Sequence, residues 1–134
     1  MYILNQKVYI WVIHGECMIN AIVDQRRFAI VKAKEKAEAW ACIDDGREIT
    51  LIVEESKINN IKPIKKEKDF RLITFDANLD FSLTGFISNI SNKLAEAKIP
   101  IFVISAFSTD HILVKEQYLK NTTKQLEALY FKVI

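Results

Sequence analysis

The chain of 134 residues is 50% hydrophobic and 27% charged, which suits one compact domain or two small half-domains sharing a core and argues against disorder. Its 19 Lys and Arg against 17 Asp and Glu leave a formal charge of +2, a weak field for binding nucleic-acid backbones. The apolar run from Val8 to Ile13 is too short to span a bilayer and lacks the flanks of a signal peptide. We therefore expect a cytoplasmic protein without nucleic-acid or membrane partners, in which Cys17 and Cys42 stay as thiols.

The first half of the chain predicts a small sheet. Residues 1–17 contain one plausible strand, Lys7 to Ile13, and are expected to be an N-terminal extension. Further strands are expected at Phe28 to Val31, Ala41 to Ile43 and Ile49 to Val53, with a short helical segment at Lys34 to Ala39 and a tight turn at Asp44-Asp45-Gly46. The charged stretch from Ser56 to Lys68 predicts a linker, which separates an incomplete half at residues 18–60 from a domain at residues 69–134.

The second half has clearer periodicities. A β-rich run at Arg71 to Phe75 precedes apolar residues at helical spacing, which predict a helix from about Ser82 to Lys98. Two apolar runs then predict strands, a second helical stripe starts at Glu116, and the chain ends on β-prone residues. The order β-α-β-β-α-β is that of the ferredoxin-like fold, with two helices on one face of an antiparallel four-stranded sheet. The predicted fold class is therefore α+β.

The sequence lacks the motifs of common catalytic sites. It has no glycine-rich phosphate loop, GxSxG, HExxH or CxxC, and it contains three glycines in all. His14 and His111 could each act as a general base, but a lone histidine beside apolar strand residues is more often structural. His14, Cys17 and Cys42 lack the spacing of a metal site. Together with the missing motifs, this leads us to expect no catalysis, no metal and no cofactor.

Two polar stretches could hold a small ligand. At Leu79 to Gly85 a strand-to-helix turn carries two hydroxyls and a glycine, and the unpaired N–H groups of a helix start attract anions such as a carboxylate. In the hairpin loop from Ile104 to His111, Asp110 could accept hydrogen bonds from an ammonium group while Ser105 holds the rest of the ligand. Each stretch has a simpler interpretation, in which Ser82 caps the helix, Gly85 allows close packing and Asp110 is a turn residue.

Three segments of the second half resemble the ACT-domain proteins of the aspartate-kinase and CASTOR type: Leu79 to Ile87, Leu94 to Ser105 and Thr109 to Val114. The similarity is dense from about Phe70 to Leu129. It is weaker in the first half, where two strand motifs match and Gly46-Arg47 replaces a usual Thr-Asp pair. The resemblance implies a pair of ACT-like units, and the family's usual start near Met18 leaves residues 1–17 as extra.

The resemblance also implies an amino-acid pocket between units, built from the strand-to-helix turn of one unit and strands of its neighbour. The positions that it indicates are Ser82, Leu83, Thr84, Gly85, Ile104, Ser105, Ala106 and Asp110. Because residues 82–84 are neutral, a neutral or small amino acid fits better than a guanidinium ligand. We therefore expect a regulatory amino-acid-binding protein that catalyses no reaction.

The expected assembly is a homodimer, because unpaired sheet edges tend to associate and proteins of this family commonly pair side by side. The main alternative is a ligand-free protein–protein interaction module of ferredoxin-like fold. An RNA-binding sheet would need more aromatic residues than Phe102 and Phe107 together with basic rims. A small enzyme is the remaining alternative.

Overall fold

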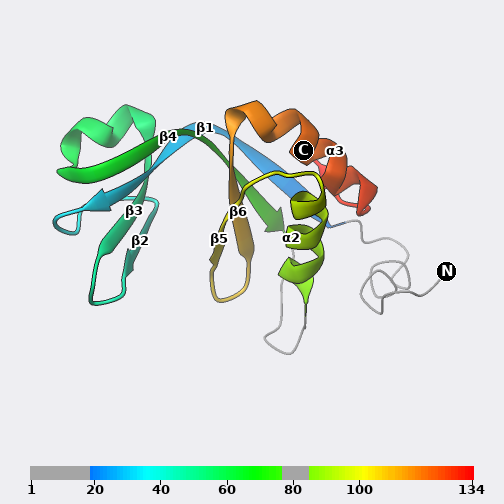
Figure 1. The fold of residues 1–134 in the computed structure, drawn as a ribbon, viewed down its shortest axis with the longest axis horizontal. Coiled ribbons are helices and arrows are strands. Elements are labelled where there is room, and N and C mark those ends of the chain that lie inside the picture. Colours follow the sequence, from blue (N-terminus) through cyan, green and yellow to red (C-terminus); the bar gives the residue numbers. More distant parts are fainter. Residues whose placement is uncertain (1–18, 77–84) are drawn as a thin grey trace.

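The computed structural model describes residues 19–76 and 85–134, which form one seven-stranded sheet with helices (Figure 1). The elements of the N-terminal half are β1 (Asn20–Ala33), β2 (Ala41–Asp44), β3 (Ile49–Glu54) and the 3-10 helix η1 (Glu55–Asn60). Those of the C-terminal half are β4 (Pro63–Asp76), α2 (Phe86–Glu96), β5 (Phe102–Ser105), β6 (Asp110–Lys115), the 3-10 helix η2 (Glu116–Tyr118), α3 (Leu119–Ala128) and β7 (Lys132–Val133). The predicted extension at residues 1–17, with its strand Lys7 to Ile13, lies outside the described residues.

The predicted α+β, ferredoxin-like fold is confirmed. From β4 to β7 the element order is β-α-β-β-α-β, and buried residues of α2 and α3 join one cluster on the same face of the sheet. The fourth strand differs from the expected arrangement, because β1 lies between β4 and β7 and pairs antiparallel with β4 and parallel with β7. The strand order is β2-β3-β1-β4-β6-β5, with β7 beside β1.

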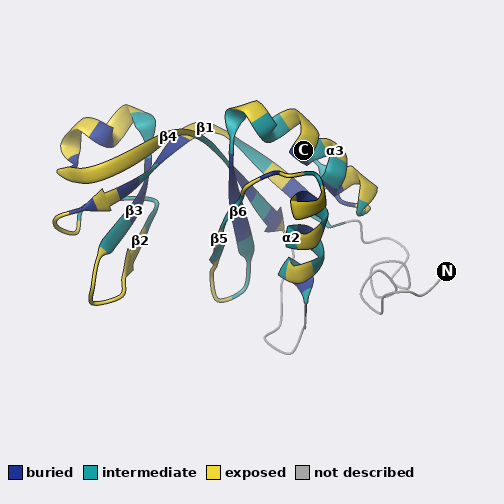
Figure 2. Cartoon of the chain, in the orientation of Figure 1, coloured by how far each residue is buried: buried dark blue, intermediate teal, exposed yellow. Residues whose placement is uncertain are grey.

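The main core lies between the sheet and the two helices. Helix α2 buries Phe86, Ile90 and Leu94, which recur at four-residue spacing and therefore form one stripe along the helix. The ring centroids of Phe86 and Phe131 lie 5.7 Å and 5.1 Å, respectively, from the ring centroid of Phe75 on β4. Figure 2 shows the opposite, exposed face of α2 turned away from the sheet.

Strands β1 and β4 are each 14 residues long and run through both halves, forming the arch in Figure 1. Their pairing shifts register between Val23 and Arg27 and again between Phe28 and Ile30, so the ladder contains bulges where the arch bends. Opposite the second shift, Asp69 has a φ of 67°. Bulges increase the local twist of a strand pair, which lets the two halves of the sheet face one another.

Two sequence predictions about the first half are wrong. Residues Ser56 to Lys68 are not a linker, because η1 and the start of β4 occupy them. The first half of β4 pairs only with β1 and is exposed, so its Lys and Glu residues look like a loop in the sequence. Residues Lys34 to Ala39 form bends and no helix.

The hydrogen-bond registers of the two halves repeat each other. The ladder β1-β3-β2 has the same order and directions as the ladder β4-β6-β5. Ala33 pairs with Ile49 at one end of the first ladder, and Phe75 pairs with Asp110 at the corresponding end of the second. In the N-terminal half the bends at residues 34–40 stand where α2 stands in the C-terminal half.

Candidate ligand-binding site

The described part of the predicted site lies at one end of the C-terminal sheet. Asp110 begins β6 and pairs with Phe75 of β4 on one side and with Ser105 of β5 on the other. Residues directly opposite each other in a ladder project to the same face, so these three side chains share the face that carries α2. Helix α2 begins over this end, since its first residue, Phe86, packs against Phe75. Gly85, Ser105 and Asp110 are therefore brought to one corner of the fold.

Within residues 19–76 and 85–134, the Asp110 carboxylate makes no hydrogen bond or ion pair. The aspartates of the other hairpin behave differently: the Asp44 carboxylate accepts the Gly46 N–H at 2.9 Å, and the Asp45 carboxylate accepts the Arg47 N–H at 2.8 Å. A turn aspartate stabilises its turn through such bonds. Asp110, which is partly exposed, has oxygens free to accept from a ligand.

Gly85 is the N-cap residue of α2 and adopts a left-handed conformation, with φ 70° and ψ 18°. This backbone geometry favours glycine, which gives Gly85 a structural role as well as any role at a ligand. Gly85 provides no side-chain cap for the first turn of α2, and its carbonyl accepts the N–H of Asn89 at 3.2 Å. The first-turn N–H groups of a helix have no partner within that helix.

The other predicted positions divide into three groups. Ile104 packs against a buried cluster on the opposite face of the sheet, formed by Phe28, Ile52, Leu72 and Leu113. Its side chain therefore points away from Asp110. Ala106 is exposed, and its N–H donates to the Thr109 carbonyl at 2.8 Å, which closes the hairpin loop. Ser82, Leu83 and Thr84 lie outside the described residues.

His111 connects the two halves of the protein and is only 8% exposed. Its Nδ1 lies 2.9 Å from the Thr74 hydroxyl and its Nε2 lies 3.1 Å from the Thr109 hydroxyl. The ring of Trp40, from the N-terminal half, meets the imidazole edge-on at a centroid distance of 5.0 Å. Burial lowers the pKa of His111, and the negative charge of Asp110 opposes that change in part. These contacts are those of a structural histidine.

Within residues 19–76 and 85–134, no group of three or more His, Cys, Asp or Glu side chains is placed to hold a metal ion. Cys42 is an exposed free thiol on β2. No helix in the same ranges is long and apolar enough to cross a membrane.

Residues 65–128 match the family model of the ACT domain. None of the curated proteins matches this sequence. The fold is similar to protein Atu0741 from Agobacterium tumefaciens, with a TM-score of 0.74 and 20% identity over 88% of this chain and 93% of that chain. Protein VC0802 from Vibrio cholerae has a TM-score of 0.69 and 20% identity, over 84% of this chain and 91% of that chain. The regulatory subunit of aspartate kinase from Thermus thermophilus has a TM-score of 0.60 and 7% identity, over 85% of this chain and 99% of that chain.

Proposed function

Since residues 65–128 match the family model of the ACT domain, we propose that this protein is a regulatory protein that binds an amino acid and catalyses no reaction. The observation that carries the proposal is the Asp110 carboxylate, which lies on the face where α2 begins and has no polar partner among the described residues. The N–H groups at the helix start suit the ligand's carboxylate, and Asp110 suits its ammonium group. The regulatory part of the proposal is supported by the fold shared with a regulatory subunit of aspartate kinase.

The proposed site contains Gly85, Ser105, Asp110 and the backbone of residues 104–106, together with residues 82–84. In this proposal residues 18–60 are an incomplete ACT-like half and residues 69–134 are the complete one. The repeated ladder register supports that division, because each half supplies the same three-stranded arrangement. The neutral side chains of residues 82–84 favour a neutral or small amino acid.

A thermal-shift screen against the twenty amino acids tests the proposal. A ligand present at about 100 times its dissociation constant stabilises the folded protein by about 2.7 kcal/mol, which raises the melting temperature by several degrees. No shift with any amino acid would contradict amino-acid binding. Turnover of an amino acid by the purified protein would contradict the absence of catalysis.

The substitution Asp110→Asn tests the site. It removes a charge-assisted hydrogen bond to the ligand's ammonium, so calorimetry should show binding of the best amino acid weakened about ten- to a hundredfold. The unfolding free energy without ligand should barely change, because no described residue forms a hydrogen bond or ion pair with the Asp110 carboxylate. Glu35→Gln removes the same charge in the other half, from an exposed ion pair with Lys62, and should leave affinity unchanged. Equal affinity in Asp110→Asn and the parent protein would remove Asp110 from the site.

We also propose that the protein forms a homodimer. Among the described strands, β2 and β5 each pair with one neighbour and so present a free edge there. Edges of this kind associate readily unless they are covered. Sedimentation at tens of micromolar should therefore show a dimer, and a strict monomer with and without amino acid would contradict this part of the proposal.

A ligand-free interaction module is the alternative function. The observation that favours it is the exposure of Ile43 on β2 and Val103 on β5, which places apolar side chains on both free edges. In that case no amino acid would change the melting temperature, while Val103→Lys would weaken association. Association that strengthens with a bound amino acid would instead support the regulatory proposal.

A further inference from the structure

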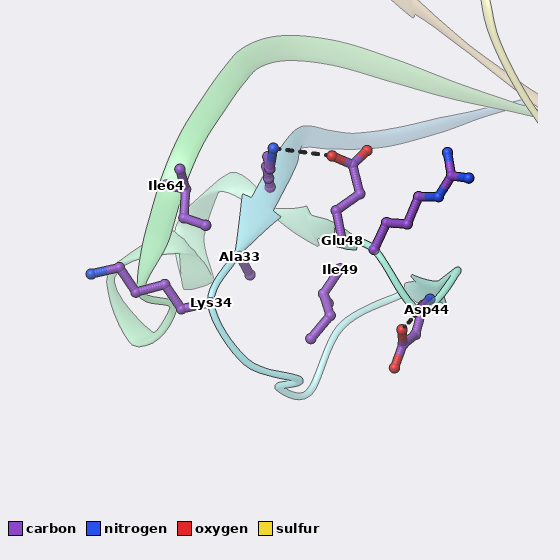
Figure 3. Close-up of a pocket in the computed structure, with 9 residues that line it drawn as sticks. Ala33, Lys34, Asp44, Glu48, Ile49 and Ile64 are labelled. Carbon is purple, nitrogen blue, oxygen red and sulfur yellow. Dashed lines mark hydrogen bonds and ion pairs between the residues drawn. The ribbon is translucent and has the colours of Figure 1, made fainter.

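A pocket of about 390 Å³ lies at the end of the N-terminal sheet (Figure 3). It occupies the position that corresponds, in the repeated ladder, to the Asp110 corner of the C-terminal half. Ala33 stands at the register position of Phe75, and Ile49 at that of Asp110. A small alanine, itself only 5% exposed, replaces the phenylalanine, bends replace α2, and the pocket lies beside this buried alanine.

The acidic groups of the pocket are already neutralised. The Glu48 carboxylate forms an ion pair with the Lys32 ammonium at 3.1 Å, drawn as a dashed line in Figure 3. The Asp44 carboxylate accepts the Gly46 N–H and pairs with Lys36 at 3.1 Å, and both contacts lower the pKa of Asp44. Neither carboxylate is therefore available as the partner of a cationic ligand.

Two cations of the lining have no such partner. In the part of the chain that the structure describes, the Arg47 guanidinium and the Lys34 ammonium form no hydrogen bond or ion pair, although their backbone N–H groups are bonded. The bonds that the Asp45 carboxylate accepts fix the turn that carries Arg47. Lys34 extends outwards from the rim in Figure 3, on a flexible stem.

The remaining surface of the pocket is apolar. In Figure 3 the Ile64 and Ile49 side chains flank Ala33, and Ile64 is 51% exposed. An exposed isoleucine beside two unpaired cations suits a ligand with an apolar group and a negative charge. We propose that this pocket binds a small organic carboxylate that has a short branched apolar chain and no ammonium group. An amino acid is disfavoured there, because the lining carries the cations Lys34 and Arg47, and its two carboxylates are already paired and cannot accept the ammonium.

The test is an amide NMR titration of the full chain with sodium 4-methylpentanoate. We expect saturable shifts centred on Gly46, Arg47 and Ile64, and little response to the neutral 4-methylpentanamide. Arg47→Gln should weaken binding about five- to tenfold, since it loses a charge-assisted bond to the carboxylate. Lys124→Gln removes an equal charge from the exposed surface of α3 and should leave affinity within about twofold of the parent.

Three results would overturn the inference: equal binding of the amide and the carboxylate, shifts centred on the β5–β6 hairpin, or unchanged affinity in Arg47→Gln. Arg47→Gln should not impair folding, because the Arg47 side chain makes no polar contact with any residue that the structure describes. Leucine should leave the signals of Gly46 and Ile64 unchanged. Because amino-acid binding at Asp110 would shift β5–β6 signals, either site can fail while the other stands.

Discussion

At the scale of single residues, His111 shows how one side chain joins the two halves. Its imidazole is enclosed by Thr74, Thr109 and the Trp40 ring. A hydroxyl can donate or accept, so neutral His111 is satisfied in either tautomer and protonated His111 also finds acceptors. Protonation is therefore opposed mainly by burial, which lowers the pKa of His111 from its ordinary value of 6.5.

The lowered pKa of His111 predicts a pH dependence of stability. The unfolded chain binds a proton near pH 6.5 while the folded protein does not, so the unfolding free energy is highest above 6.5 and falls as the pH drops below that value. Urea unfolding between about pH 7.5 and about pH 5.5 should show this fall in the parent protein, and His111→Gln should abolish it. Arg26 lowers the pKa values of Asp24 and Glu54, so these carboxylates lose their contribution to the unfolding free energy only in more acidic solution.

His14→Gln is the matched control, because it removes the other imidazole of the sequence. The pH dependence should persist in this variant. Its loss from His14→Gln, or its survival in His111→Gln, would show that another group is responsible.

Local sequence patterns predicted part of the candidate site. Asp110 and Ser105 could be selected because they follow an apolar strand within one short hairpin. Arg47 and Lys34 were missed as ligand-binding candidates, because their meeting depends on the turn between β2 and β3 and on the end of β1. The structural role of His111 was anticipated, but Trp40 is far away in the sequence and could not be named as its neighbour.

At the scale of elements, one arginine makes hydrogen bonds at the bend of β1 and β4. The bulge in β1 leaves the Asp24 carbonyl outside the regular ladder, and Arg71 donates to it from Nε at 3.2 Å and from a terminal nitrogen at 2.8 Å. The same guanidinium pairs with Glu116 at 3.1 Å, which ties the bend to the start of η2. The Arg71 side chain is 16% exposed, so water replaces these contacts poorly.

Replacing Arg71 should therefore destabilise the protein. Arg71→Met removes the donors to the Asp24 carbonyl and the partner of Glu116, and we expect a loss of about 2 to 3 kcal/mol in urea unfolding. Arg27→Met removes an exposed arginine whose ion pairs are 3.4 Å and 3.6 Å long, and it should cost well under about 1 kcal/mol. Similar losses in the two variants would contradict a special role for Arg71 at the bulge.

Element prediction from the sequence succeeded where apolar periodicity was continuous. The apolar stripe predicted a helix from about Ser82 to Lys98, of which α2 occupies Phe86–Glu96 with Gly85 as its N-cap. The alternation from Ile49 to Val53 predicted β3. It failed at the start of β4, where charged residues pair with β1 and remain in solvent. Periodicity reports burial, so it cannot detect a strand that buries neither face.

At the scale of the whole molecule, the two halves cannot be separated along the chain. Residues of β1 pair with β7 at one end and with β3 at the other, and β4 likewise takes part in both halves. A buried cluster joins Phe28, Ile52, Leu72 and Leu113, one from each of β1, β3, β4 and β6. Disruption of either half therefore removes hydrogen-bond partners and packing from the other.

This sharing of strands predicts one cooperative unfolding transition. Trp40 fluorescence reports the N-terminal half and its contact with His111, in a Trp11→Phe background that removes the other tryptophan. Amide NMR signals of Ile90 and Leu126 report α2 and α3. The two probes should give the same urea midpoint, as expected for a two-state domain. Leu51→Ala, a cavity substitution in the N-terminal core, should cost about 2 to 5 kcal/mol and lower both midpoints equally.

Phe75→Ala provides the reciprocal test, because it opens a cavity in the C-terminal core beneath α2. If β1 and β4 couple the halves, this variant should lower the Trp40 midpoint as much as the midpoint of the helical signals. An early Trp40 transition in Leu51→Ala, with the signals of α2 and α3 still native, would show that the C-terminal half folds alone. The two halves would then be independent folding units that dock through β1 and β4. Ligand binding at Asp110 could not be transmitted to the N-terminal pocket through a common fold.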